Sequence, residues 1–322
     1  HILCKEVDKM EKRENCRHQV YDALAAGIRN MVRHAAADDD RLEEIRMRTG
    51  QPLMIRYDGR EQILPAVQQP HIVTKEEMRE TMDYISHYSL YAYSEELKHG
   101  FVTIEGGHRV GVAGKVITEQ EKVKNVQHIS SVNIRVSHEV IGCADPLLPY
   151  IVLDGRICHT LLISPPGCGK TTMIRDLIRQ ISDGNEYIEG CSVGVVDERS
   201  ELGGCYMGIP RNHLGKRTDI LDCCPKAAGM LMLIRSMAPR VIAVDEIGSR
   251  EDVQAVEYAM QCGCRLIASV HGMDMDEALR KPALGDLIRK RVFERYVVLG
   301  CDEHPGRIRE IYDGRGRSLW NG

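Results

Sequence analysis

The segment ISPPGCGKTT, residues 163–172, restricts the possible folds of this chain more than any other stretch. It follows the apolar run HTLLIS at 159–164, which predicts a strand. After it, Ile174, Leu177 and Ile181 share one face of a predicted helix. A strand, a glycine-rich turn and a helix in this order form a P-loop, in which backbone N–H groups and the helix N-terminus surround phosphates. The segment therefore predicts a nucleotide-binding α/β unit.

One position departs from the P-loop motif G-x-x-x-x-G-K-[ST], because Ser164 stands where the motif has glycine. The strand becomes a loop at this position, so the serine side chain need only avoid the phosphates. Gly167 and Gly169 still allow the backbone to bend around a phosphate. Proline has no N–H group, so the backbone donors begin at Gly167. We expect the nucleotide to contact Ser164, Pro165, Pro166, Gly167, Cys168, Gly169, Lys170, Thr171 and Thr172.

Two residues of the P-loop and two later acids carry specific chemistry. We expect Lys170 to reach the β- and γ-phosphates of ATP, and Thr171 to hold Mg²⁺. The apolar run VIAVDE at 241–246 ends in two carboxylates, Asp245 and Glu246. Such a strand beside the P-loop strand is the Walker B arrangement, in which one acid holds the Mg²⁺ shell and another orients the attacking water. The two motifs together predict ATP binding with Mg²⁺.

The two halves of the chain differ in pattern. In the second half, short continuous Val/Ile/Leu runs alternate with helical patterns, which predicts a parallel sheet buried on both faces. In the first half, alternating apolar residues around Gly106 and Gly107 predict a hairpin. We therefore predict a smaller α+β domain at 1–145 and an α/β P-loop domain at 146–322. The predicted helices of the first half lie at 1–39 and 74–100, and the predicted strands of the second half at 159–164, 192–198, 240–246, 265–270 and 294–300.

The composition is that of a globular protein, with 43% hydrophobic residues, 28% charged residues and a net charge of −4. No apolar run reaches the roughly 18–20 residues that span a bilayer, which predicts a cytoplasmic location. The twelve cysteines lack both the regular framework of a disulfide-stapled secreted protein and the spacings of a zinc site. We expect them to be reduced and to serve mostly as small buried hydrophobic residues.

A resemblance to a known family rests on residues 193–253, VGVVDERSELGGCYMGIPRNHLGKRTDILDCCPKAAGMLMLIRSMAPRVIAVDEIGSREDV, and on GHRVGVAGKV and SSVNIRV in the first half. These segments resemble the stage III sporulation protein AA family of endospore-formation ATPases, which is itself similar to the type II and type IV secretion ATPases. The resemblance covers nearly the whole chain and is most specific over 159–272. It implies a RecA-like P-loop NTPase core with four landmarks: the P-loop, an acidic box, the Walker B strand and a histidine box.

These landmarks imply roles for individual residues. The acidic box corresponds to Asp197 and Glu198, and the histidine box, ASVHG, to His271. Secretion ATPases have glycine where this chain has Asp245, so the resemblance assigns the attacking water to Glu246 and leaves the Mg²⁺ shell to Asp245. The carboxyl ends of parallel strands meet at one edge of a sheet. We therefore expect the acidic box, Glu246 and His271 to converge on the γ-phosphate.

The resemblance also implies an assembly. Such ATPases form hexameric rings with nucleotide at the subunit interfaces, to which the N-terminal domain contributes arginines. Arg135 in VNIRVS is the best candidate, and Arg217 and Arg235 are alternatives from the ATPase half. The family would dock from the cytoplasm onto membrane-embedded stage III sporulation proteins. There it would power or assemble a channel between mother cell and forespore.

Two other functions remain open. A similar P-loop family carries a nucleic-acid-binding appendage, and EEIRMR and GGHRVGV contain arginines, so an ATPase that acts on single-stranded nucleic acid is the main alternative. Two phenylalanines and one tryptophan supply few platforms on which bases could stack, which makes nucleic acid the weaker candidate. The presence of both Lys170 and Glu246 argues against a non-catalytic nucleotide-binding scaffold.

Overall fold

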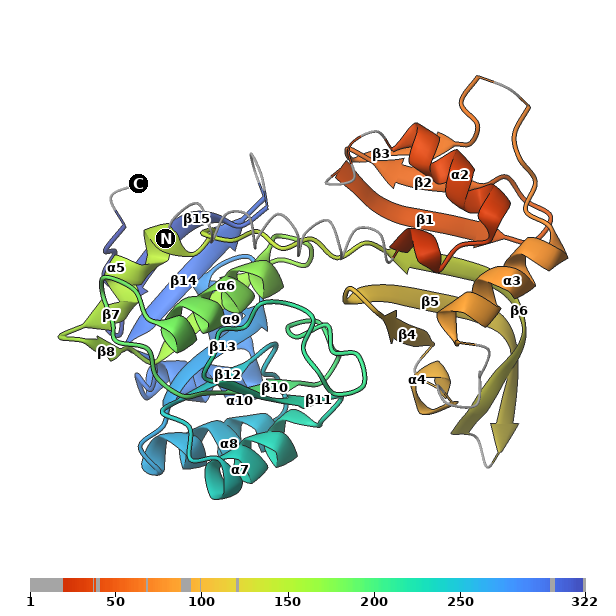
Figure 1. The fold of residues 1–322 in the computed structure, drawn as a ribbon. Coiled ribbons are helices and arrows are strands. Elements are labelled where there is room, and N and C mark those ends of the chain that lie inside the picture. Colours follow the sequence, from red (N-terminus) through yellow and green to blue (C-terminus); the bar gives the residue numbers. More distant parts are fainter. Residues whose placement is uncertain are drawn as a thin grey trace. The chain divides into compact units, whose positions relative to one another are not determined.

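The computed structural model describes residues 20–36, 38, 41–67, 69–87, 94–98, 100–119, 122–301 and 305–320. The chain divides into two compact units, His1–His138 and Glu139–Gly322 (Figure 1). Each unit buries its own hydrophobic core. The predicted α+β domain, 1–145, extends beyond the end of the N-terminal unit at His138, and the P-loop lies in the C-terminal unit.

The N-terminal unit is built on a six-stranded antiparallel sheet with the strand order β3-β2-β1-β6-β5-β4. Two helices, α2 and α3, contribute apolar residues to the core on one face of this sheet (Figure 1). The strands are β1 (Leu42–Arg48), β2 (Met54–Tyr57), β3 (Arg60–Ile63), β4 (Phe101–Ile104), β5 (His108–Glu119) and β6 (Lys122–Arg135), and the helices are α2 (Ala26–Ala35), α3 (Lys75–Ile85) and α4 (Ser94–Lys98).

Period-two alternation along these strands separates a core face from an outer face. Ile45 of β1 pairs with Ile134 of β6, and both are fully buried in the core that α2 and α3 complete. The next residue along β6, Arg135, belongs to the opposite face, where it lies between Glu44 of β1 and Arg109 of β5. The alternation thus places Arg135 on the face that the core helices leave uncovered.

The C-terminal unit contains a seven-stranded sheet with the order β11-β10-β12-β13-β9-β14-β15. The strands are parallel except for the edge strand β15, which runs antiparallel to β14. The strands of this sheet are β9 (Thr160–Ser164), β10 (Val193–Asp197), β11 (Thr218–Asp222), β12 (Val241–Val244), β13 (Arg265–His271), β14 (Arg295–Gly300) and β15 (Arg307–Asp313). The remaining elements are η3 (Asp145–Leu147), α5 (Leu148–Ile151), the hairpin β7 (Val152–Leu153) and β8 (Arg156–Ile157), α6 (Lys170–Asp183), α7 (Lys226–Ser236), α8 (Arg250–Gln261), α9 (Met275–Arg280) and α10 (Pro282–Arg289).

Helices cover both faces of this sheet, which explains why its central strands are continuously apolar. On one face, Ile174 and Leu177 of α6 belong to the same core as Val193 and Val241 of two central strands. On the other face, α7, α8 and α10 form a second core with the alternate residues of the same strands. All residues of β9, β10 and β12 are buried. The result is a three-layered α/β unit with the carboxyl ends of β9, β12 and β13 at one edge.

The architecture is the predicted one, an α/β P-loop core with a parallel sheet preceded by a smaller α+β unit. All five predicted strands of the second half coincide with β9, β10, β12, β13 and β14 within one or two residues. A capping box begins α3, since the Thr74 hydroxyl accepts from Glu77 N–H and the Glu77 carboxylate accepts from Thr74 N–H. Its effect is to satisfy two N–H groups that the first turn of a helix leaves unpaired.

Three predictions differ from the structure. The Walker B strand does not lie beside the P-loop strand, because β13 is inserted between β9 and β12. Residues 74–100 do not form one helix: α3 ends at Ile85, and the Ser86 hydroxyl donates to the carbonyl of Met82 in its last turn. The strands β11 and β15 were not predicted, because both carry charged residues and lie at the sheet edges. Of the helix predicted at 1–39, residues 1–19, 37 and 39 lie outside the described part of the chain.

No helix among the described residues is long and apolar enough to cross a membrane.

A buried aspartate on α6 explains why the C-terminal unit begins before residue 146. The Asp176 carboxylate accepts hydrogen bonds from Gly142 N–H at 3.0 Å and from Ala144 N–H at 2.9 Å. Its other oxygen pairs with the Arg179 guanidinium at 2.6 Å, and the Asp176 side chain is only 3% exposed. These contacts attach residues 142–144 to the P-loop helix, so the connecting segment becomes part of the C-terminal unit.

Replacing Asp176 should therefore destabilise the C-terminal unit strongly. We expect Asp176→Ala to lower the free energy of unfolding by about 3–5 kcal/mol, because it leaves a largely buried arginine and two backbone donors without their acceptor. Asp286→Ala is the matched control, since Asp286 makes the same i,i+3 pair with Arg289 but is 66% exposed. The control should cost less than about 1 kcal/mol. Urea unfolding of both variants measures the difference, and equal losses would contradict the structural role of Asp176.

Candidate functional site

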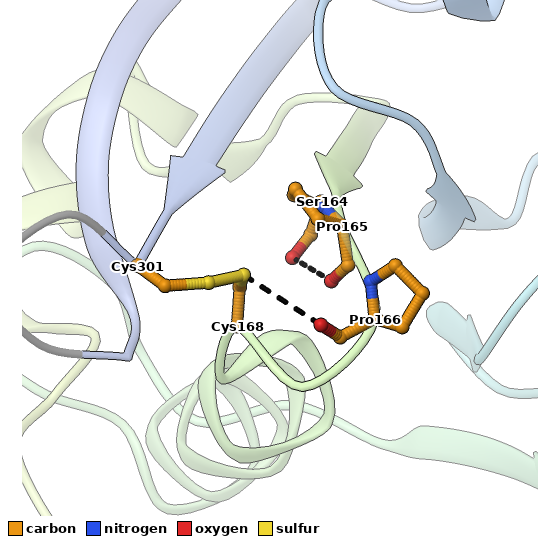
Figure 2. Close-up of a disulfide and its surroundings, with 5 residues drawn as sticks. All are labelled: Ser164, Pro165, Pro166, Cys168 and Cys301. Carbon is orange, nitrogen blue, oxygen red and sulfur yellow. Dashed lines mark hydrogen bonds between the residues drawn. A yellow bond between two sulfur atoms is a disulfide. The ribbon is translucent and has the colours of Figure 1, made fainter.

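The P-loop connects β9 to α6 with the backbone conformation that phosphate binding requires. Gly167 and Gly169 have φ angles of 75° and 78°, in the left-handed region that glycine adopts without steric cost. Gly169 is the N-cap of α6, which begins at Lys170. Ser164, at the position where the motif has glycine, is fully buried and donates its hydroxyl to the carbonyl of Pro165 at 3.0 Å (Figure 2). The serine is thus satisfied within the loop itself.

A buried ion pair links the P-loop to the Walker B strand. Lys170 Nζ lies 2.8 Å from Asp245 Oδ1, and the two side chains are 7% and 15% exposed. Thr171 Oγ1 donates to the other carboxylate oxygen of Asp245 at 2.8 Å. Burial by itself would raise the pKa of Asp245, but the charge of Lys170 and the hydrogen bonds to the carboxylate outweigh it and lower the pKa below its ordinary value. Asp245 is therefore ionised at neutral pH.

The oxygen atoms of Thr171 and Asp245 are a donor set that suits Mg²⁺. Mg²⁺ binds hard oxygen ligands and usually keeps several waters, so one carboxylate and one hydroxyl beside a phosphate are sufficient. The residues present thus fit the metal that the two motifs predict. No cluster of three or more His, Cys, Asp or Glu side chains that could hold a metal by itself occurs among the described residues.

Ser269 of β13 holds the end of the Walker B strand in place. Its hydroxyl donates to Asp245 Oδ1 and accepts the N–H of Glu246 at 2.9 Å. Its carbonyl accepts the N–H of Ile247 at 2.8 Å. Glu246 itself has φ 59°, a left-handed conformation that a non-glycine residue seldom adopts. A fully buried serine between β9 and β12 thus fixes the directions of both acids.

Glu246, which directly follows Asp245 in the sequence, contacts His271 of β13. Glu246 Oε1 lies 3.2 Å from His271 Nε2, and Glu246 Oε2 lies 3.4 Å from Arg199 Nη1. These side chains line a cavity of about 380 Å³, large enough for part of a nucleotide or for the water that attacks it. The cavity is lined by Glu198, Arg199, Lys226, Glu246, Ile247, Gly248, Ser249, Asp252, Val270, His271 and Lys281.

The two residues of the acidic box have different surroundings. Glu198 lines the cavity and forms an ion pair with Lys226 of α7. Asp197 is buried, and its carboxylate accepts the backbone N–H groups of Glu201, Leu202 and Gly203 at 2.8–2.9 Å. Burial raises the pKa of Asp197 to about 6, although the three donors stabilise its charged form. The prediction that Asp197 faces the γ-phosphate therefore needs correction: its carboxylate orders the loop that follows β10.

The candidate arginines lie in both units. Arg135 is on β6 of the N-terminal unit, 64% exposed, with its Nε 3.8 Å from Glu44 Oε1. Arg217 donates to the carbonyl of Ser182 at 2.9 Å and so braces the end of α6. Arg235 lies in the last turn of α7. Arg217 therefore has a structural role at the end of α6.

The sequence motifs do not indicate that three further residues belong to the site. Arg199 directly follows the acidic box, but nothing in its spacing indicates that it pairs with Glu246. Lys226 lies at the start of α7, after an edge strand that was not predicted. Ser269 lies inside the histidine box, and its role depends on the position of β13 between β9 and β12.

The prediction that all cysteines are reduced is wrong for one pair. Cys168 of the P-loop and Cys301, which directly follows β14, form a disulfide with a Cα–Cα distance of 5.1 Å (Figure 2). The cause is the fold: β14 pairs with β9, so the loops that leave these two strands emerge side by side. The other described cysteines are free and mostly shielded from solvent, as predicted.

Solved structures with the same fold include those of an ATPase and of a pilus retraction motor. The Legionella pneumophila ATPase DotB aligns with a TM-score of 0.56 at 15% sequence identity, over 83% of this chain and 74% of that protein. The pilus retraction motor PilT, in a crystal structure with bound ADP, aligns with a TM-score of 0.55 at 16% identity, over 83% and 77% of the two chains. The predicted RecA-like fold with a smaller preceding domain is thus confirmed.

Sequence comparison shows the family of the chain, which the shared fold alone does not. The family described as "Sporulation stage III, protein AA" matches residues 13–319. Stage III sporulation protein AA of Bacillus subtilis (strain 168) is 43% identical over 278 residues, which are 86% of this chain and 89% of that protein. Protein SEEDLING PLASTID DEVELOPMENT 1 of Arabidopsis thaliana is 31% identical over 48% of this chain but over only 22% of its own length. The family match spans both units, and the chain therefore belongs to the sporulation stage III protein AA family.

Proposed function

We propose that this protein is an ATPase of the sporulation machinery that binds ATP with Mg²⁺ at the P-loop and hydrolyses it. One observation carries the proposal. Lys170, Thr171 and Asp245 are in direct contact, and Glu246 and His271 contact each other at the same edge of the sheet. The fold shared with DotB and with ADP-bound PilT supports the same function.

Binding would use groups that the structure already brings together. The N–H groups from Gly167 onward and the N-terminus of α6 supply donors for phosphate oxygens. In the nucleotide-bound protein, the Lys170 ammonium would exchange the Asp245 carboxylate for the β- and γ-phosphates. Asp245 and Thr171 would then hold Mg²⁺, whose charge would stabilise the negative charge that develops during phosphoryl transfer.

Hydrolysis would use Glu246 as the group that orients the attacking water and accepts its proton. Its carboxylate lines the cavity, apart from the Lys170–Asp245 ion pair, and is held by His271 and Arg199 at 3.2 and 3.4 Å. His271 is well placed to respond to the γ-phosphate, because it contacts the catalytic base and ends the strand beside the P-loop strand. Glu198 also lines the cavity, and together with its ion-pair partner Lys226 it would contribute to the charge of the cavity.

The proposal includes an assembly around this site. We infer a homo-oligomer, a hexamer by resemblance, in which Arg135 of one subunit reaches the nucleotide of another. Its exposure on the outer sheet face favours this role over a purely local one. By the same resemblance the ring would dock on membrane-embedded sporulation proteins at the cytoplasmic surface, and there power or assemble a channel.

The two Walker B acids should fail in different ways. We expect Glu246→Gln to bind MgATP but to lower turnover at least about 100-fold, equivalent to about 2.7 kcal/mol of transition-state stabilisation. Asp245→Asn should instead weaken the Mg²⁺-dependent part of ATP binding, because it removes a ligand of the metal and the partner of Lys170. Single-turnover hydrolysis and MgATP titrations, with and without Mg²⁺, measure both effects.

The opposite outcome would reverse the assignment of the two acids. If the Asn variant retains bound ATP while the Gln variant still turns over, Asp245 and not Glu246 is the base. The same assay with single-stranded DNA tests the alternative function, and stimulation by DNA would favour a nucleic-acid-dependent ATPase.

Removing the arginine of the N-terminal unit should affect turnover alone. We expect Arg135→Ala to lower turnover at least about tenfold with ATP affinity unchanged, because an arginine beside the γ-phosphate acts on the transition state. Arg60→Ala, at an exposed position of the edge strand β3, is the control and should keep full turnover. Sedimentation at several protein concentrations completes the test. An enzyme that stays monomeric with undiminished turnover would contradict the assembly.

A further inference from the structure

We propose that Cys168 and Cys301 form a redox-reactive site that controls nucleotide exchange at the P-loop, with a small dithiol or disulfide as its reactant. The inference rests on the proposed function for the identity of the ligand, since it takes the P-loop as the nucleotide site. The reaction of the cysteine pair itself can be measured without nucleotide.

The pairing of the two cysteines follows from the fold. The strands β9 and β14 are parallel neighbours, with Ile163 opposite Val298. Their carboxyl ends therefore reach the same edge of the sheet, and Cys168 and Cys301 follow these ends. The Cα–Cα distance of 5.1 Å lies within the range of about 4.4–6.8 Å that a disulfide spans. The covalent bond joins segments that are 133 residues apart in the sequence.

A second contact ties the same two segments together. Gly306 N–H donates to the carbonyl of Cys168 at 3.0 Å. A Cβ atom at Gly169 would lie 2.7 Å from the backbone nitrogen of Gly306, so the backbone at Pro305 and Gly306 rests directly on the P-loop. Cys168 stands between Gly167 and Gly169, the two residues whose left-handed conformation shapes the phosphate cradle. The disulfide thus adds a covalent bond in the part of the P-loop that would surround the phosphates.

The two sulfurs differ in access, which determines how the bond would react. Cys301 is exposed, whereas Cys168 is 2% exposed and lies at the N-terminal end of α6. The thiolate of a small dithiol would attack Cys301 Sγ, and Cys168 would leave as a thiolate that the helix N-terminus stabilises. The second thiol of the reagent would then attack its own sulfur in the mixed disulfide and release Cys301. In total the reagent loses two electrons and two protons and becomes a cyclic disulfide, while both cysteines become thiols.

Buried and half-buried thiols elsewhere in the same unit are poor competitors for this exchange. Burial raises the pKa of Cys143 to about 12, and burial also raises the pKa of Cys205. Both side chains are therefore protonated at neutral pH, and a protonated thiol is a weak nucleophile. Cys262 is exposed and free, which makes it the natural comparison for a cysteine outside the P-loop.

The consequence for function concerns the rate at which nucleotide leaves. In the oxidised protein Cys168 is held by a hydrogen bond from Gly306 and by a covalent bond to Cys301. Reduction leaves the hydrogen bond alone, so the cradle can open more readily. Because product release limits many nucleotide-driven enzymes, a slower release would also reduce turnover.

The test uses the full chain, equilibrated with dithiothreitol or with oxidised glutathione. Mass measurement after alkylation counts the free thiols, and stopped-flow measurement with a fluorescent ADP analogue gives the release rate. We expect the oxidised protein to have two fewer reactive thiols and to release the analogue at least about threefold more slowly than the reduced protein. Cys301→Ser should release it at the reduced rate under both conditions. Cys262→Ser should keep the wild-type difference.

The possible contrary results are distinct. An unchanged thiol count at Cys168 and Cys301 in oxidised glutathione would overturn the redox site itself. Equal release rates in the two wild-type states, with the disulfide present in one, would overturn the control of exchange. If the analogue binds in neither state while the disulfide forms, the proposed ATPase function fails, and the effect on nucleotide fails with it.

Discussion

The ion pair between Lys170 and Asp245 is the contact on which the rest of the site depends. It joins the first residue of α6 to the residue that follows β12, although β13 separates β12 from the P-loop strand β9. A charge pair this deeply buried is tolerated only when further hydrogen bonds satisfy its polar atoms, and here Thr171 and Ser269 supply them. The four residues form one polar network at the carboxyl edge of the sheet. Nucleotide binding would replace one partner in this network rather than create a site from separate parts.

The same network explains how two adjacent acids can have separate tasks. Asp245 continues the direction of β12 and faces the lysine, whereas Glu246 has φ 59° and faces His271. Ser269 holds both arrangements through one hydroxyl. A left-handed residue held in this way costs about 1–3 kcal/mol, which is typical of functional sites where direction matters more than local stability. The proposed metal ligand and the proposed base are therefore separated by backbone geometry as well as by residue type.

The sequence predicted the fold class, the P-loop and five of the strands in the C-terminal sheet, because these depend on local pattern. It did not predict the spatial order of the strands. Because β13 lies between β9 and β12, Ser269 of β13, and not a residue of the P-loop strand, contacts both Walker B acids. Asp197 was expected at the γ-phosphate because the family resemblance assigns it to the acidic box at a strand end, yet its carboxylate turns back to the loop that follows. The Cys168–Cys301 bond joins loops 133 residues apart, and only the pairing of β9 with β14 makes it possible.

The most direct test of the account is MgATP binding by Lys170→Ala, measured by isothermal titration with Lys290→Ala as the control. Lys290 pairs with Glu257 at 2.9 Å on an exposed helix end, so its loss should leave affinity unchanged. Circular dichroism and thermal unfolding establish that both variants are folded. The account predicts that Lys170→Ala loses at least about 100-fold in affinity, about 2.7 kcal/mol, because it removes the cation that would meet the β- and γ-phosphates. Wild-type affinity in the folded Lys170→Ala variant would contradict it.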